Sequence, residues 1–344
     1  MRFSGRRLER WGVLLALVWV FTAQRVLAQA EPPLEAPVPL PAPEEELPQL
    51  EPSRWLEAVD EQAVPEEERP PMLRVFLGSA VPWRQYCARP GATSCGEFDA
   101  RDPSLRQGDS VDFRSQVPYA GGALEVELFP LTRQQSPLSG LGLTASYQHA
   151  FARTRVQVRS PTGQSPAREV FATDQAFEAM LAWRYFFGLG RGARPLWGHG
   201  GLRLGLMGRA FAGDEAVDSP LPVTHRLFPA VGLDVSVPML RVLRVFGAGR
   251  LFLRPRPGEG ELLFGGSTLA AEVRDHGESV SSLGWSAELG VAGELWGPVG
   301  YSARFRLTSF HDGFSGKGTR RGWLAGGVAE ELYATALAGV TLSW

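Results

Sequence analysis

The alternation of apolar and polar residues at the end of the chain is the feature that most restricts its fold. Counting back from Trp344 in steps of two gives one largely apolar set, Leu342, Val340, Ala338, Ala336, Ala334 and Leu332. The residues between them are more polar: Ser343, Thr341, Gly339, Leu337, Thr335, Tyr333 and Glu331. A period of two predicts a β-strand with one apolar face. Chain ends are usually frayed and polar, so we expect this final strand to be paired with its neighbours.

The period of two begins at residue 72 and continues to the end of the chain, and no period of 3.6 extends over twelve residues. It predicts ten strands, at residues 72–84, 118–130, 140–156, 169–187, 197–212, 223–237, 242–256, 284–296, 299–311 and 329–344. The connections after every second strand are fairly short, and the others are mostly longer. This arrangement is typical of a transmembrane, antiparallel, up-and-down β-barrel. Eight to twelve strands stay possible, because residues 257–283 could hold another hairpin.

A soluble β-sandwich is the alternative all-β fold, because its strands also alternate. In a sandwich the polar strand faces meet bulk water, whereas in a barrel they line a narrow lumen in which charges need partners. Three successive predicted strands, 242–256, 284–296 and 299–311, carry arginines, then glutamates, then arginines on the same face. Opposite charges on neighbouring strands attract each other, which favours the barrel.

Extending this alternation around the sheet predicts a lattice of ion pairs that fills the lumen. Its members are Arg74, Glu125, Glu127, Glu178, Arg184, Arg203, Arg209, Asp234, Arg244, Arg250, Glu288, Glu294, Arg304 and Arg306. The inner face of the last strand is expected to be polar but uncharged, through Ser343, Thr341 and Thr335. A solvated sheet face with chance alternation of sign is the plainer interpretation of the same pattern.

The charge distribution divides the chain into three parts. Residues 1–30 have a net charge of +4 and hold a basic start, an apolar run at 11–23 and small residues at Ala28 and Ala30. This pattern predicts a secretory signal peptide that is cleaved near Ala30. Residues 31–71 have a net charge of −10 and contain eleven prolines, which predicts a disordered periplasmic segment. Residues 72–344 have a net charge of +4 and would form the barrel.

The two cysteines, Cys87 and Cys95, are separated by seven residues that include Pro90 and Gly91. Export would place them in an oxidising compartment, so we predict a local disulfide in a loop that faces outward. Two cysteines alone make no credible metal site, and we expect neither a metal nor a cofactor.

Taken together, the signal peptide, the alternating strands and the aromatic final residue resemble bacterial outer-membrane β-barrel proteins. In that family the last strand carries the signal that the barrel-assembly machinery reads, and Val340, Leu342 and Trp344 match its alternating positions. The family often has tyrosine where Val340 stands. The resemblance covers the pattern of residues 72–344 and identifies no subfamily. It implies a monomer in the outer membrane of a Gram-negative bacterium, with lipid and the assembly machinery as partners.

The search for catalytic motifs yields little. The five histidines form no metal-binding motif. Asp275–His276 and His311–Asp312 each place an acid beside a histidine near a predicted loop, but the chain has no D-x-D motif. No nucleic-acid signature is present, because the arginines recur at strand period. We therefore expect a structural or surface-interaction protein with a lumen largely filled by side chains. The alternatives are a narrow, weakly anion-selective pore and an outer-rim hydrolase of lipids or peptides that uses a histidine–aspartate pair.

Overall fold

The structure is a computed structural model in which the described residues are 70–115, 117–134, 136–156, 159–160, 163–164, 168–189, 196–213, 223–258 and 269–344. The predicted signal peptide and all but the last two residues of the predicted acidic segment therefore lie outside the described residues. Ten long strands form the barrel: β1 (Leu73–Pro90), β3 (Ala120–Leu128), β4 (Leu141–Val156), β7 (Arg168–Leu189), β8 (Leu196–Gly213), β9 (Thr224–Leu240), β10 (Leu243–Phe252), β11 (Ser279–Trp296), β12 (Val299–Ser315) and β13 (Gly327–Ser343). The shorter elements are β2 (Val111–Arg114), β5 (Arg159–Ser160), β6 (Gly163–Gln164), α2 (Cys95–Ala100), α4 (Leu269–His276), η3 (Pro103–Leu105) and η4 (Pro137–Gly140).

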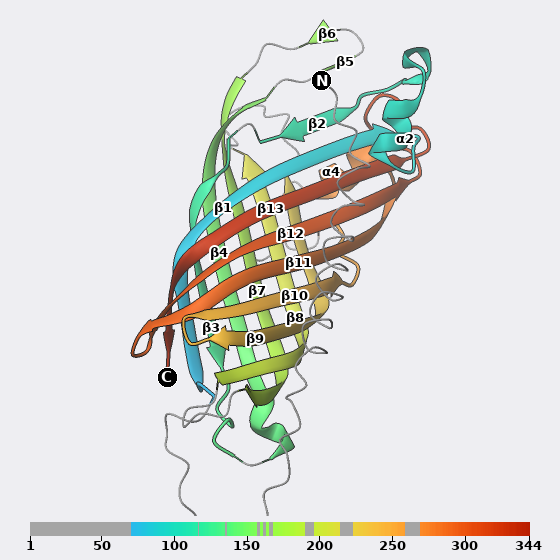
Figure 1. Ribbon diagram of the computed structural model, residues 1–344. Helices are drawn as coiled ribbons and strands as arrows, with labels where there is room; N and C mark the ends of the chain where they lie inside the picture. The colour runs from blue at the N-terminus through green and yellow to red at the C-terminus, as the bar shows by residue number, and fades with distance from the viewer. Residues whose placement is uncertain are drawn as a thin grey trace, which may run out of the picture. The chain divides into compact units, whose positions relative to one another are not determined.

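The ten long strands form one closed antiparallel sheet (Figure 1). Each strand pairs with the next along the chain, and β1 pairs with β13 from Arg74↔Ser343 to Pro90↔Gly327. This closure rules out the soluble sandwich and confirms the predicted barrel and its ten strands. The final strand is paired on both sides, as expected, with β1 and β12. The short strand β2 pairs with β1 beyond the point where β3 ends, and so continues the line of β3.

The register of the strands sets the tilt of the barrel. The Cα partners of Leu73, followed strand by strand through Leu128, Leu143, Leu181, Leu204, Val231, Leu251, Trp285, Ser309 and Leu332, lead back to Gln85 on β1. The sheet is thus staggered by twelve residues per circuit, the difference between positions 73 and 85. A stagger of twelve over ten strands corresponds to a tilt of about 40°, which is usual for barrels.

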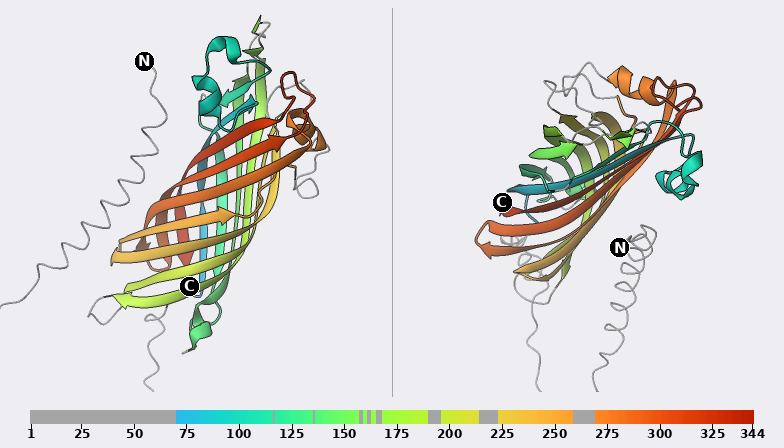
Figure 2. Two further views of the ribbon diagram at one scale, coloured as in Figure 1. Left: turned by 90° about the vertical axis from the view of Figure 1, so that its right-hand side faces the viewer. Right: turned by 90° about the horizontal axis from the view of Figure 1, so that it is seen from above.

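The connections differ at the two ends of the barrel. At the turn end, where Trp344 lies, two residues join β9 to β10 and two join β11 to β12. The connection from β3 to β4 at the same end is longer and carries η4. At the loop end, the connections are mostly longer than the two-residue turns and carry α2, η3, β2 and α4 (Figure 2). No helix in the described part of the chain is long and apolar enough to cross a membrane.

The possible extra hairpin within residues 257–283 falls largely outside the described residues, and the described part of this stretch contains α4 and the beginning of β11. One predicted strand is too long: β10 ends at Phe252, four residues before the predicted end. Arg254 has a φ of 52°, in the left-handed region that breaks an extended run. Pro255 follows it and cannot donate a backbone hydrogen bond to a sheet.

The outside and the inside of the barrel are inverted relative to a soluble protein. On β11, Leu289 is 66% exposed, whereas the neighbouring Glu288 is 8% exposed. The same alternation leaves a belt of large apolar side chains on the outer surface, including Leu77, Leu143, Leu202, Leu204, Leu233, Leu251, Leu295 and Phe305. An apolar exterior around a charged interior is the arrangement of a transmembrane barrel.

Candidate functional site: the charged interior of the barrel

The charged side chains of the lumen come from inward positions on nine of the ten long strands, all except β4, because alternate residues of a strand point to the same side. The structure divides them into two groups along the barrel. We call the group near the turn end the turn-end network; it contains Arg74, Glu125, Glu127, Glu178, Arg184, His199, Arg203, Asp234, Arg250, Glu288, Arg304 and Arg306. All of these except His199 belong to the predicted lattice.

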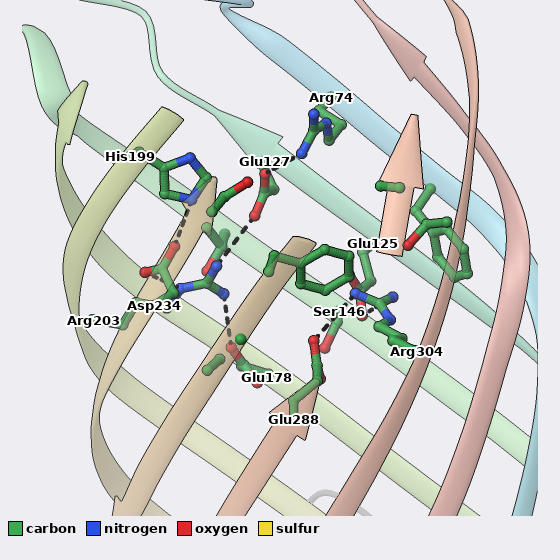
Figure 3. A pocket seen from close by; sticks show the side chains of 18 of the residues that line it. Arg74, Glu125, Glu127, Ser146, Glu178, His199, Arg203, Asp234, Glu288 and Arg304 are labelled. Carbon is green, nitrogen blue, oxygen red and sulfur yellow. Dashed lines mark hydrogen bonds and ion pairs between the residues drawn. The ribbon is translucent and has the colours of Figure 1, made fainter. Parts of the chain in front are cut away.

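One half of the turn-end network is centred on Asp234 of β9 (Figure 3). Its carboxylate accepts hydrogen bonds from Arg184 Nε at 3.0 Å and Arg203 Nε at 2.9 Å, and His199 Nε2 lies 2.9 Å away. Arg184 also holds Glu127 of β3 through two bonds, of 2.6 and 3.0 Å. Bidentate pairing of this kind is the strongest form of arginine–carboxylate contact.

The other half of the turn-end network is centred on Glu288 of β11. This carboxylate lies 2.5 Å from Arg306 Nε and 3.6 Å from Arg304 Nη1. Arg304 in turn reaches Glu125 of β3 at 2.6 Å. On β7, Glu178 lies 3.1 Å from Arg250 and 3.6 Å from Arg203, and so joins the two halves. The contacts cross the lumen between strands far apart in the sheet.

Three predicted lattice residues behave differently. Arg244 and Glu294, both near the turn end, have no ion pair within 4.0 Å among the described residues. Arg209 lies outside the turn-end network and pairs with Asp174 of β7 at 2.5 Å. Asp174 was absent from the predicted lattice.

A second set of buried charges lies nearer the loop end. We call it the loop-end network; it contains Arg84, Asp174, Arg209, Arg226, Asp312 and Glu331. Arg226 of β9 holds Asp312 of β12 through bonds of 2.6 and 3.0 Å, and reaches Glu331 of β13 at 3.1 Å. Arg84 of β1 also pairs with Glu331. All six side chains are buried.

The loop-end network overturns the expectation that the inner face of the last strand is uncharged. Glu331 lies on the same face as Thr335 and Thr341, and it is 2% exposed. Its partner Arg84 lies on the same face of β1 as Arg74. Counting the alternation ten residues further along each of these strands would have found this pair in the sequence.

An apolar layer separates the two networks, and we define it by Met180, Met207, Phe228, Phe252, Phe310 and Tyr333. Phe310 lies between Arg306 and Asp312 on β12, and Phe228 lies between Arg226 and Asp234 on β9. The rings of Phe228, Phe252 and Phe310 are 4.7–5.8 Å apart. A cavity of about 80 Å³ lies on the turn-end side of this layer.

The residues of the two candidate catalytic pairs make separate contacts. His276 packs against Trp323 and Phe314, while Asp275 bonds Thr319 at 2.7 Å. The second pair, on β12, is split by the strand alternation. Asp312 points into the lumen and His311 points outward, with its Nδ1 atom 3.6 Å from Glu330. The alternation of β12 therefore separates the imidazole of His311 from the carboxylate of Asp312.

The loop end is tied to the barrel wall by the predicted disulfide, which is present between Cys87 of β1 and Cys95 of α2. Both sulfur atoms are therefore unavailable as thiolate ligands, although Glu330 lies near them. Below the bond, Arg89 of β1 holds Asp99 at 2.9 Å and Asp112 at 2.7 Å. Phe98 of α2 packs in a cluster with Val328 of β13, so α2 covers the junction between the first and last strands.

The predicted assembly signal lies on the outer face of β13. Val340 is 47% exposed and Trp344 is 57% exposed, whereas Leu342 is less so. The backbone of Trp344 exchanges two hydrogen bonds with Leu73, of 2.9 and 3.0 Å. The last residue of the chain is therefore held in the barrel wall beside the first residue of β1.

No family model and no curated protein matches the sequence. The barrel is similar to the outer membrane protease OmpT from Escherichia coli, at 8% identity and a TM-score of 0.41, over 79% of this chain and 96% of that one. It is also similar to the translocator domain of the autotransporter NalP from Neisseria meningitidis, at 13% identity and a TM-score of 0.33, over 84% and 93% of the chains. The P. putida toluene transporter TodX matches at 7% identity and a TM-score of 0.25, over 82% and 92%. The strand pairing and the apolar exterior by themselves make the chain a closed, ten-stranded transmembrane-type β-barrel, and no subfamily is identified.

Proposed function

We propose that this protein is an integral outer-membrane β-barrel that acts as a rigid carrier for its extracellular loops rather than as a channel. Residues 1–30 would direct export and be removed near Ala30. The barrel would be inserted as a monomer by the barrel-assembly machinery, with Val340, Leu342 and Trp344 as its signal. The turn end would then face the periplasm, together with residues 31–71, and the loop end would face the outside.

The filled lumen is the observation that carries this proposal. Two ion-pair networks and the apolar layer between them are built from strands on opposite sides of the barrel. A hydrated ion that passed along the lumen would have to separate paired charges and then cross the apolar layer. Both steps are costly, because they leave charges in a region of low dielectric without partners.

The ordered loop end supports the surface role. The disulfide and Arg89 fix α2, and the indole N–H of Trp323 donates to the backbone oxygen of Asp109 at 2.9 Å. Trp323 is fully buried and belongs to one apolar cluster with Phe113, Tyr119 and Phe211. A loop surface with its own core loses little conformational entropy when it binds a partner.

Planar-bilayer recording of the purified protein tests the closed lumen. We expect no discrete conductance steps from the natural protein, and steps from a Phe228→Ala/Phe252→Ala/Phe310→Ala variant whose apolar layer has been removed. A matched control replaces Leu202, Leu233 and Leu289 on the outer face by alanine. Steps from the natural protein would instead support the narrow anion-selective pore.

The barrel itself has a simpler test. A closed barrel in detergent keeps its fold until it is heated, so it should migrate differently on gels before and after boiling. A monomer that stays soluble without detergent would contradict the membrane location.

A further inference from the structure

The turn-end mouth of the lumen differs from the rest of the interior because its arginines outnumber its acids. A small cavity of about 20 Å³ opens there beside the 80 Å³ cavity, and the two share Arg74, Glu127 and Arg184 in their walls. Arg244 of β10 lines only the small cavity. Three arginines and a single carboxylate, that of Glu127, therefore surround the mouth.

The carboxylate at the mouth, that of Glu127, already pairs with arginines other than Arg74 and Arg244. Glu127 makes its bidentate contact with Arg184 and lies 3.3 Å from Arg203. Its distance to Arg74 is 3.9 Å, which is long for an ion pair. The Nε atom of Arg74 is buried and has no hydrogen-bond partner among the described residues. Arg244 lacks an ion pair within the same part of the chain, as stated above.

Arg74 and Arg244 are partly buried, and their neighbouring carboxylates, Glu127 and Glu294, lie farther from them than the carboxylates that pair with the other arginines of the turn-end network. Partly buried charges held at this distance from their counter-charges are costly. The protein around these arginines has a low dielectric constant, which strengthens their electric field. A cleft lined by charges of one sign also concentrates ions of the opposite sign. Arginine is also the side chain that suits carboxylate and phosphate oxygens, because its planar N–H groups can donate in pairs.

From these observations we propose that the mouth of the barrel binds a small oxyanion, a phosphate or carboxylate group, between Arg74 and Arg244. The ligand enters from the turn end, which the proposed orientation makes the periplasmic side. Phe129, Phe186 and Trp197 form the apolar wall of the mouth. The proposal goes beyond the loop-carrying role and does not depend on it, because the site lies at the opposite end of the barrel.

The anion stops at the mouth because the cavity beyond it is balanced. Five arginines and five carboxylates line the 80 Å³ cavity. The buried hydroxyl groups of Thr144 and Ser236 also face that cavity and have no partner among the described residues. Hydroxyls in a polar cavity of this size are suited to bonding a few ordered water molecules. We therefore place the charge of the ligand at Arg74 and Arg244, and water further in.

Titration calorimetry with inorganic phosphate tests the site on the full-length protein in detergent. We expect saturable binding that weakens at least tenfold in Arg244→Gln and in Arg74→Gln, and that is partly kept in Arg244→Lys. The matched control is Arg241→Gln, because Arg241 is an exposed arginine in the adjacent turn that lines neither cavity. Acetate that competes with phosphate would show that the site accepts carboxylates too.

Three results would overturn the proposal: no saturable binding to the natural protein, equal binding by Arg244→Gln, or an equal loss in Arg241→Gln. A second measurement uses only the natural protein, so it does not depend on whether the variants fold. Crystals soaked in selenate should show an anomalous peak between Arg74 and Arg244. A soaked crystal without that peak would contradict the site.

Discussion

The two charged networks of the lumen use the same chemistry in different surroundings. The turn-end network borders a cavity and continues into an open mouth, and part of its positive charge has no close partner. The loop-end network is sealed between the apolar layer and the apolar cluster of the loops, and its three arginines face three carboxylates. Where water and ions can enter, the barrel leaves charge uncompensated, and where they cannot, each charge is matched. Burial therefore decides how strictly the charges must balance.

The largest expected difference between the two networks is in the stability that is lost when one carboxylate is removed from each. Glu331→Gln leaves Arg84 and Arg226 with less compensation in a dry interior, and removing one partner of a buried pair costs about 3–5 kcal/mol. The equivalent change in the turn-end network, Glu127→Gln, should cost less, roughly 1–3 kcal/mol, because water can reach the freed groups from the mouth. Urea unfolding in lipid vesicles measures both. Equal losses of unfolding free energy would show that the two networks are equally dry.

Loss of the disulfide at the loop end should have the next largest effect on stability. Replacement of Cys87 and Cys95 by serine removes a short disulfide loop, which should lower the free energy of unfolding by about 2–3 kcal/mol. The loss should affect the loop end more than the turn end, since the main contacts of α2 are with β1 and β13 at the loop end. Hydrogen exchange of β1 residues near Pro90 and near Leu73 separates the two ends. Equal acceleration at both would mean that the barrel opens as one unit.

The smallest effect concerns a charge that lies outside the barrel. Glu97 of α2 accepts hydrogen bonds from Thr93 and Arg101, which lower the pKa of its carboxyl from 4.5 to about 2. A lowered pKa in the folded state means that Glu97 stabilises α2 above pH 4.5 and stops doing so as the pH falls towards 2. Glu97→Gln should therefore remove the pH dependence of the protection of α2 amides, which is the exchange rate relative to that of the unfolded chain, over this range. Because Glu97 is exposed, the change should be slight.

The sequence predicts the number of strands, the closed barrel and the inward direction of the charges, because all three follow from a period of two. It could not predict which charges meet. Arg304 of β12 reaches Glu125 of β3 across the lumen, and no neighbour rule along the sheet pairs these two strands. Such contacts depend on the stagger of the strands and on the width of the barrel, which appear only when the sheet closes.

The residues and elements that the sequence did not predict were missed for different reasons. Arg84 and Glu331 follow the alternation that identified their neighbours, so a longer count along β1 and β13 was sufficient to find them. The helix α4 has only eight residues, too few for its period to stand out from its surroundings. The packing of Phe310 between two charged layers could not be predicted either, because an inward phenylalanine on a polar face has no interpretation until its neighbours across the lumen are known.

The position of the disulfide has a consequence for the order of synthesis. Cys87 and Cys95 belong to the first strand and the connection that follows it, so in the proposed export of the chain they would leave the export channel long before residues 327–343. Oxidation needs only these few residues, whereas β13 must wait for the rest of the chain. The cross-linked cap can thus be complete while the barrel is still open, and the final strand then arrives at an edge whose outer end is already shaped to receive Val328.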